Sequence, residues 1–123
     1  MIARVWKASA TLEGAGRYAE HFDAAVLPEL RRLDGCSAAY LLTRESEDQV
    51  EIQVITHWES LETIRAFAGD DLDHAVVETA AQAALTNFEQ TVTHFTVVAA
   101  WPTNVATPAD VATPADVTTP ADA

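Results

Sequence analysis

The stretch 50–69, VEIQVITHWESLETIRAFAG, constrains the fold most, because a strand pattern passes into a helix pattern across a single Trp-Glu-Ser step. Its first part is rich in β-branched side chains interleaved with polar ones, as in a half-buried strand. Beyond this step the apolar residues recur at helical spacing, at Leu61, Ile64, Phe67 and Ala68. Ser60 is a favourable N-cap, and Gly69 is a favourable residue just past a helix end. The stretch therefore predicts one strand that leads directly into one short helix.

The N-terminal part predicts a strand followed by a helix. Residues 2–7 have the apolar pattern of a short strand, and Gly14 and Gly16 interrupt the chain after it. Beyond these glycines, bulky apolar residues recur at four-residue spacing, at Tyr18, Phe22, Val26 and Leu30. Pro28 should kink this helix or begin its last turn, because its ring clashes with the carbonyl four residues back. We expect the helix to end near Leu33.

Three more segments complete the order of elements. Residues 36–44 read as a strand that a polar tip joins to the strand starting at Gln49, which makes a hairpin. Region 70–87 reads as Ala-rich helix or turn, and 90–99 as the final strand. This order predicts an α+β fold of the ferredoxin-like split βαβ type, with an antiparallel sheet ordered 4-1-3-2 and both helices on one face. The last three strands are apolar on both sides, so a second sheet should cover the face without helices.

Several short motifs carry a family resemblance. HWES at 57–60 leads into LETIRAFAG, and MIARVW, LPEL and VTHFTV stand at 1–6, 27–30 and 92–97. On these motifs, residues 1 to about 99 resemble the antibiotic biosynthesis monooxygenase (ABM)-type domain of the dimeric α+β barrel superfamily. That family contains cofactor-free oxygenases, haem-degrading enzymes and proteins with no assigned activity. The resemblance implies a homodimer whose two sheets pack face to face into a barrel.

The end of the chain is a repeat that cannot build a core. From Val105 the sequence reads VATPAD, VATPAD and VTTPAD, which places a proline in every unit. Each proline removes a backbone donor, and each unit offers few apolar atoms to bury. We therefore expect one folded domain over residues 1–104 and a flexible, low-complexity tail over 105–123.

Charge and composition exclude several partners. With 19 acidic residues against 7 lysines and arginines, the chain carries a net charge of −12, which repels phosphate backbones, so nucleic acid is not expected to bind. The single cysteine, Cys36, excludes an internal disulfide. No signal peptide is recognised, and no stretch approaches the ~20 apolar residues that span a bilayer. A cytoplasmic protein without a membrane partner is the simplest expectation.

The histidines do not have the spacing of a metal site. They stand at His21, His57, His74 and His94, in four different predicted elements. Neither an HxH nor an HxxxH pair occurs, and Cys36 has no second cysteine with which to form a ligand pair. We expect neither a metal nor another cofactor.

The candidate site is a set of aromatic and histidine residues spread over the sheet and helices. A cofactor-free oxygenase must hold a flat phenol, stabilise its deprotonated form and exclude water, for which aromatic walls and a His or Arg are suited. The candidate catalytic residues are His94, Trp58, His57 and Arg65, and the candidate substrate-binding residues are Trp6, Tyr40, Phe22 and Phe67. Strand alternation places His57 and Trp58 on opposite faces. Core packing of the tryptophans and a surface ion pair of Arg65 with Glu62 or Glu59 are the alternatives.

The preferred function is a cofactor-independent monooxygenase that acts on a small aromatic, phenolic or polyketide-like substrate. A non-catalytic dimeric barrel that binds a small apolar ligand is the alternative from another class. The resemblance also admits haem binding, for which the aromatic and ligand positions fall on Phe67 and near Val77, with His74 one turn earlier. Trp6 and Lys7 stand where the haem-degrading relatives have an asparagine.

Overall fold

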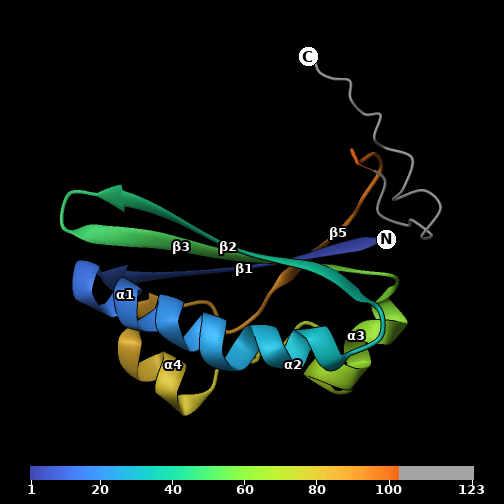
Figure 1. Cartoon of the computed structure of the whole chain (residues 1–123), viewed down its shortest axis with the longest axis horizontal. Helices are drawn as coiled ribbons and strands as arrows, with labels where there is room; N and C mark the ends of the chain where they lie inside the picture. Colours follow the sequence, from blue (N-terminus) through green and yellow to red (C-terminus); the bar gives the residue numbers. More distant parts are fainter. Residues whose placement is uncertain (103–123) are drawn as a thin grey trace.

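The computed structural model describes residues 1–102, so the expectation of a flexible tail over 105–123 lies outside the described residues. One antiparallel sheet carries all the helices on one face (Figure 1). The strands are β1 (Ile2–Thr11), β2 (Cys36–Ser46), β3 (Gln49–Trp58), β4 (Asn87–Phe88) and β5 (Thr93–Thr96). The helices are α1 (Leu12–His21), a π-helical segment (Phe22–Val26), α2 (Leu27–Arg32), α3 (Leu61–Ala68) and α4 (Thr79–Ala84).

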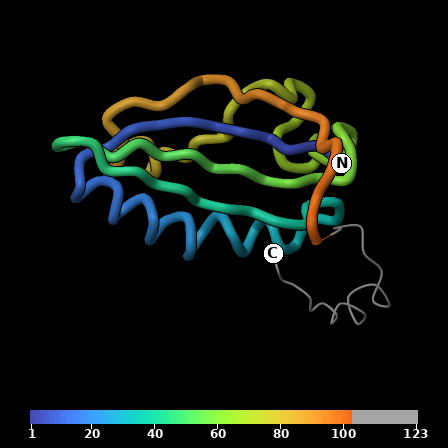
Figure 2. The backbone as a smooth tube through the Cα atoms, turned by 90° about the horizontal axis from the view of Figure 1, so that it is seen from above, coloured from blue at the N-terminus to red at the C-terminus, as the bar shows by residue number. Residues whose placement is uncertain are grey.

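The sheet confirms the predicted strand order. β3 lies between β2 and β1, and β4 and β5 both pair with the other edge of β1 (Figure 2). Counted together as one final strand, β4 and β5 complete the order 4-1-3-2. β1 is longer than predicted, because it pairs with β3 along its whole length, from Ile2 opposite Trp58 to Thr11 opposite Gln49.

The final strand differs from the prediction of one continuous strand over 90–99. Between β4 and β5 the backbone turns away from β1 toward residues 73–75: the Ala75 amide donates to the Gln90 carbonyl at 2.9 Å, and the Val92 amide donates to the Asp73 carbonyl at 2.9 Å. His74 and Thr91 form an isolated bridge there. The segment before α4 therefore takes the hydrogen bonds that a continuous strand would have given to β1.

The first helix begins earlier than predicted, and its glycines lie inside it. Thr11 caps α1 by accepting a hydrogen bond from the Gly14 amide at 3.0 Å, so the helix starts at Leu12. At Gly14 an added Cβ would stand 2.3 Å from the Ala84 carbonyl oxygen at the end of α4. Gly14 is therefore needed for the close approach of two helices rather than for an interruption of the chain.

Alanine at the two glycines of α1 is expected to change stability in opposite directions. Gly14→Ala should lower the free energy of unfolding by about 1–3 kcal/mol, because its Cβ overlaps backbone that has to move. A Cβ added at Gly16 has no atom within 4 Å, so Gly16→Ala should raise the free energy of unfolding by up to about 1 kcal/mol. Urea denaturation of the two variants measures the difference. Equal stability of both would contradict the close packing of α1 on α4.

Pro28 begins the last turn of the helix, as one of the two predicted outcomes. It stands at the start of α2, and the preceding turn, Phe22–Val26, is π-helical. The Leu27 amide donates to the Phe22 carbonyl, five residues back. Pro28 has no amide proton and cannot donate to the preceding turn. Because that turn is wider than an α-helical one, the helix continues past the proline.

The core lies between the sheet and its helices. Alternate residues of β1 and β3 face the helices and are buried, among them Trp6, Ile52 and Trp58. The predicted strand-to-helix unit is confirmed: Ser60 and Thr63 form a capping box at the start of α3, and Gly69 follows its last residue with a φ of 81°.

The opposite face of the sheet is not covered by any helix of residues 1–102 (Figure 1). Tyr40, Leu42 and Phe95 are each about half exposed. This apolar face is the one that the predicted dimer would bury. None of the helices in the described part of the chain is both long and apolar enough to cross a membrane.

Candidate functional site

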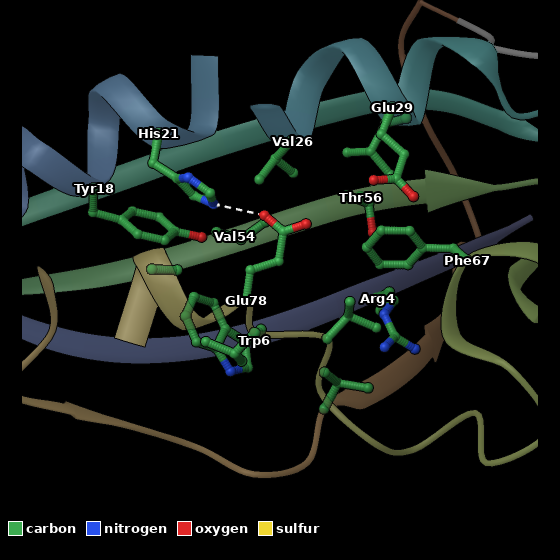
Figure 3. Close-up of a pocket in the computed structure, with 15 residues that line it drawn as sticks. Arg4, Trp6, Tyr18, His21, Val26, Glu29, Val54, Thr56, Phe67 and Glu78 are labelled. Carbon is green, nitrogen blue, oxygen red and sulfur yellow. Dashed lines mark ion pairs between the residues drawn. The ribbon is translucent and has the colours of Figure 1, made fainter. Parts of the chain in front are cut away.

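A cavity lies between the first helix, the sheet and the segment that precedes α4 (Figure 3). The space open to the centre of a water molecule is about 70 Å³, whereas one bound water needs about 10–15 Å³. The cavity therefore has room for several waters or for a small flat ring in their place. Most of its lining is apolar, and a few polar side chains converge on it, which is the usual character of a small-molecule site.

Three aromatic side chains form walls of the cavity. Trp6 comes from β1, Tyr18 from α1 and Phe67 from α3. The ring centres of Trp6 and Tyr18 are 5.9 Å apart, and the Trp6 indole N–H donates to the Glu89 carbonyl at 2.8 Å. Because that hydrogen bond satisfies the only polar atom of Trp6, the rest of its ring is available for packing against a flat ligand.

Arg4 supplies a buried positive charge to the cavity. Only 4% of the residue is exposed, and its guanidinium donates to the Leu72 carbonyl at 2.6 Å and to the His74 carbonyl at 2.9 Å. Burial lowers the pKa of Arg4 from its ordinary value to about 10, with the charge of Asp73 acting in the opposite direction. The side chain therefore stays protonated at neutral pH. It also lies over the Phe67 ring, 5.8 Å from the ring centre.

His94 holds Arg4 in place. Its Nε2 atom is 3.0 Å from Nη1 of Arg4, and its Nδ1 atom is 3.4 Å from a carboxylate oxygen of Asp73. A guanidinium can only donate, so Nε2 must accept and the ring proton must reside on Nδ1, facing Asp73. Burial and then the charge of Arg4 lower the pKa of His94, against the effect of Asp73. His94 is thus a neutral imidazole between a cation and a carboxylate.

The lowered pKa of His94 predicts a loss of stability in mild acid. The unfolded chain takes up the proton first as the pH falls, so the stabilisation is present above about pH 6.5 and is lost as the pH falls through that value toward the folded pKa. We expect urea denaturation between about pH 8 and about pH 5 to show this slope, and His94→Gln to reduce it, since glutamine does not titrate. The other histidines are unchanged in the variant and provide the background slope. An unaltered slope would contradict the assignment.

A histidine that the sequence reasoning did not select lies in the cavity wall. His21 Nε2 is 3.2 Å from Oε1 of Glu78, and this nitrogen is buried without a hydrogen bond to any described residue. Tyr18 lies beside the pair (Figure 3); burial and then the charge of Glu78 raise the pKa of Tyr18 to about 12. Tyr18 therefore remains a hydroxyl donor, and the imidazole with its carboxylate is the group able to exchange a proton.

The structure brings two of the predicted binding residues to this cavity and separates the others. Trp6 and Phe67 line it, whereas Phe22 belongs to the packed core. Tyr40 lies on the opposite face of the sheet, where its ring meets that of His57 edge to face at 5.7 Å.

The predicted catalytic residues are also distributed over several places. His57 and Trp58 do point to opposite faces, as predicted from strand alternation. Trp58 does not line the cavity: it is fully buried and donates its indole N–H to the hydroxyl of Thr56, a lining residue, at 2.8 Å. Arg65 forms surface ion pairs with Asp70 at 3.2 Å and Glu62 at 3.9 Å. The structure does not test the chemical roles of these residues, which stay predictions.

A second, more open hollow lies on the other side of Phe67 and Val77, with His74 and Arg65 in its wall. His74 is exposed there, and its carbonyl holds Arg4. Phe67, Val77 and His74 are the positions that the haem alternative would use, and that alternative also stays a prediction. Within residues 1–102, no three His, Cys, Asp or Glu side chains are grouped so that they could bind a metal ion.

Comparison with known proteins shows the fold. No family model matches the sequence, and no curated protein matches it. A structure from Deinococcus radiodurans, assigned as an antibiotic biosynthesis monooxygenase, is 15% identical and superposes with a TM-score of 0.54 over 81% of this chain and 95% of its own. SnoaB, a cofactor-independent oxygenase from Streptomyces nogalater, is 14% identical, with a TM-score of 0.53 over 83% of this chain and 98% of its own. The likeness confirms the ABM-type α+β fold that the resemblance implied.

Proposed function

We propose that this protein is a cofactor-independent monooxygenase that oxidises a small aromatic phenol in the cavity between the sheet and its helices. The observation that carries the proposal is the cavity itself, in which aromatic walls surround a buried cation and a histidine–carboxylate pair. The fold shared with a protein named as a cofactor-independent oxygenase supports it.

The reaction suited to such a cavity converts the ring carbon para to the phenol, which is a CH₂ group in the keto form of the substrate, into a carbonyl. Loss of a proton produces an electron-rich anion that passes an electron to O₂, and the two radicals combine at the ring carbon as a peroxide. Cleavage of the O–O bond leaves one oxygen atom as the carbonyl and releases the other as water, with the two hydrogens of the CH₂ group. The substrate supplies the four electrons, so no other reductant is consumed.

Different residues of the cavity are suited to different steps of this reaction. Trp6, Tyr18 and Phe67 hold the ring and exclude water. His21, with Glu78 beside it, accepts the substrate proton, and a positioned base of this kind contributes a rate factor of about 10²–10⁴. The buried charge of Arg4 favours the anion that remains. In this arrangement His94, the catalytic candidate from the sequence, acts by positioning Arg4.

We further propose that the protein is a homodimer in which a second copy covers the open face of the sheet. The half-exposed apolar side chains of Tyr40, Leu42 and Phe95 on that face support this arrangement. Burial of such side chains stabilises an interface by roughly 25 cal/mol for each Å² of apolar surface. Sedimentation of the wild type beside Leu42→Lys should show a dimer that the variant weakens.

The test of the oxygenase proposal is product formation by chelator-treated protein with anthrone-like phenols and with 1-naphthols that carry hydrogen at position 4, in air and under nitrogen. We expect turnover only in air, with one atom of ¹⁸O₂ recovered in the product carbonyl and the other in water. A rate equal to that of the protein-free solution across the panel would contradict the proposal.

One observation favours the second candidate, a non-catalytic ligand-binding protein. The guanidinium of Arg4 already donates to two carbonyls and to His94, so its position is explained by the folded structure without any substrate. This candidate predicts that phenols raise the melting temperature by mass action while no oxygen is consumed. The same panel of phenols therefore separates the two functions.

A further inference from the structure

We infer that the cavity selects phenols that carry a basic, positively charged substituent, and that Glu29 is the residue that recognises this charge. The inference rests on the proposed function for the phenol, and it adds the chemical class of the rest of the ligand. Two carboxylates, Glu29 from α2 and Glu78 just before α4, extend into the space between the helices and the sheet (Figure 3).

Glu29 is a partly buried carboxylate whose charge is not matched by a neighbour. Its residue is of intermediate exposure and lines the cavity. Among residues 1–102 it has no ion pair and no side-chain hydrogen bond, and unlike the unpaired glutamates Glu20 and Glu59 it is not exposed. A carboxylate that is partly removed from water gains from a charged donor, so the cavity presents an acceptor that a ligand cation could satisfy.

The charged groups of the cavity are arranged so that its sheet side is positive and its helix side is negative. Arg4 lies on β1, and its guanidinium already donates to protein acceptors, so it favours an anionic phenol oxygen by its field. The carboxylates of Glu29 and Glu78 come from the helix side of the cavity. His21 is already paired with Glu78, its Nε2 atom 3.2 Å from the carboxylate, so Glu29 is the carboxylate of the cavity that is left for a ligand. A ligand with its phenol toward the sheet and its cation toward the helices would match this polarity.

The charge of the whole chain acts in the same direction. A net charge of −12 disfavours the approach of an anionic ligand and favours that of a cationic one. This long-range contribution is screened within about 8 Å at physiological ionic strength, whereas a contact with Glu29 is screened much less. Salt and a matched variant can therefore separate the general charge effect from recognition by one residue.

The experiment is calorimetric titration with three 1-naphthols that carry an aminomethyl, a hydroxymethyl or a carboxyl group at the same position of the distal ring. These ligands do not need to react, so the result is independent of turnover. We expect the aminomethyl compound to bind about tenfold more tightly than the hydroxymethyl compound, as for one charge-assisted hydrogen bond, and the carboxyl compound to bind most weakly. Glu29→Gln should reduce the tenfold preference to about twofold or less.

Glu20→Gln is the matched control, because it removes the same charge from an exposed position on α1 outside the cavity. Glu20→Gln should leave the tenfold preference for the aminomethyl compound unchanged, both at low and at higher salt concentration. Equal affinities for the three ligands, a tighter carboxyl compound, or an equal effect of the two variants would overturn the inference. Selective binding of the amine without oxygen-dependent turnover of any phenol would overturn the oxygenase proposal alone, and absence of any binding would overturn both.

Discussion

Replacing Trp58 with alanine is expected to lower the free energy of unfolding by about 3–5 kcal/mol, which is the range for removing a buried aromatic side chain. Trp58 is 0% exposed and packs with Leu30 and Ile64, and its ring centre is 5.9 Å from that of Phe67. Its loss would leave a cavity between Leu30 and Ile64 and a Thr56 hydroxyl without its hydrogen-bond donor. For a body of about 100 residues this corresponds to a fall in Tm of more than about 10 °C, measurable by calorimetry.

The control for this substitution is Trp101→Ala. Trp101 is 84% exposed, so its replacement should change stability by less than about 0.5 kcal/mol. Similar losses for the two variants would show that Trp58 is not the centre of the packing with Leu30 and Ile64. A stable Trp58→Ala protein that had lost only turnover would instead favour the direct catalytic role that the sequence suggested for Trp58.

Replacing Arg4 with methionine is expected to destabilise the protein by about 3 kcal/mol or more. Methionine fills a similar volume, but the Leu72 and His74 carbonyls lose their charged donor, and hydrogen bonds to charged groups contribute about 1.5–3 kcal/mol each. These carbonyls belong to the segment between α3 and α4, so hydrogen exchange should become faster at residues 71–76 before it does in β3. Urea denaturation gives the total loss.

Arg65→Met is the matched control for Arg4, because it removes the same side chain from surface ion pairs. The Arg65 side chain is 48% exposed, and pairs of this kind contribute about 0–1 kcal/mol. An Arg4→Met protein as stable as Arg65→Met would contradict the conclusion that Arg4 connects the sheet to this segment.

Periodicity was sufficient to predict the fold because each element carries its own pattern. The step from Thr56 through Ser60 to Gly69 was predicted from β-branched residues, a cap and a terminal glycine, and all three act locally. The glycines of α1 were misread because the reason for Gly14 is the carbonyl of Ala84, which is distant in sequence. The division of the last strand has a similar cause, since Gln90 and Val92 bond to residues 73–75.

The site was less predictable than the fold, because its polar residues come from separate elements. Trp6 and Phe67, which were selected for their size, do line the cavity, but Arg4, His21 and Glu78 converge there only through the packing of β1, α1 and the segment before α4. One local signal was available. Arg4 and Trp6 stand two positions apart on β1, so their side chains must share a face of the sheet. A charge on the buried face of a strand is costly without partners, which marks Arg4 as a residue with a specific role.

The most direct test of the central claim, that this cavity is the site of an oxygenation, compares oxygen uptake by His21→Gln and His57→Gln with a phenol that the wild type converts. Both variants exchange a histidine for the same neutral side chain: His21 in α1, on the helix side of the sheet, and His57 in β3, on the opposite side. The account predicts that His21→Gln loses about 100-fold in kcat while His57→Gln stays within about twofold of the wild type. Unchanged uptake in His21→Gln together with a large loss in His57→Gln would place the chemistry on the other face and contradict the account.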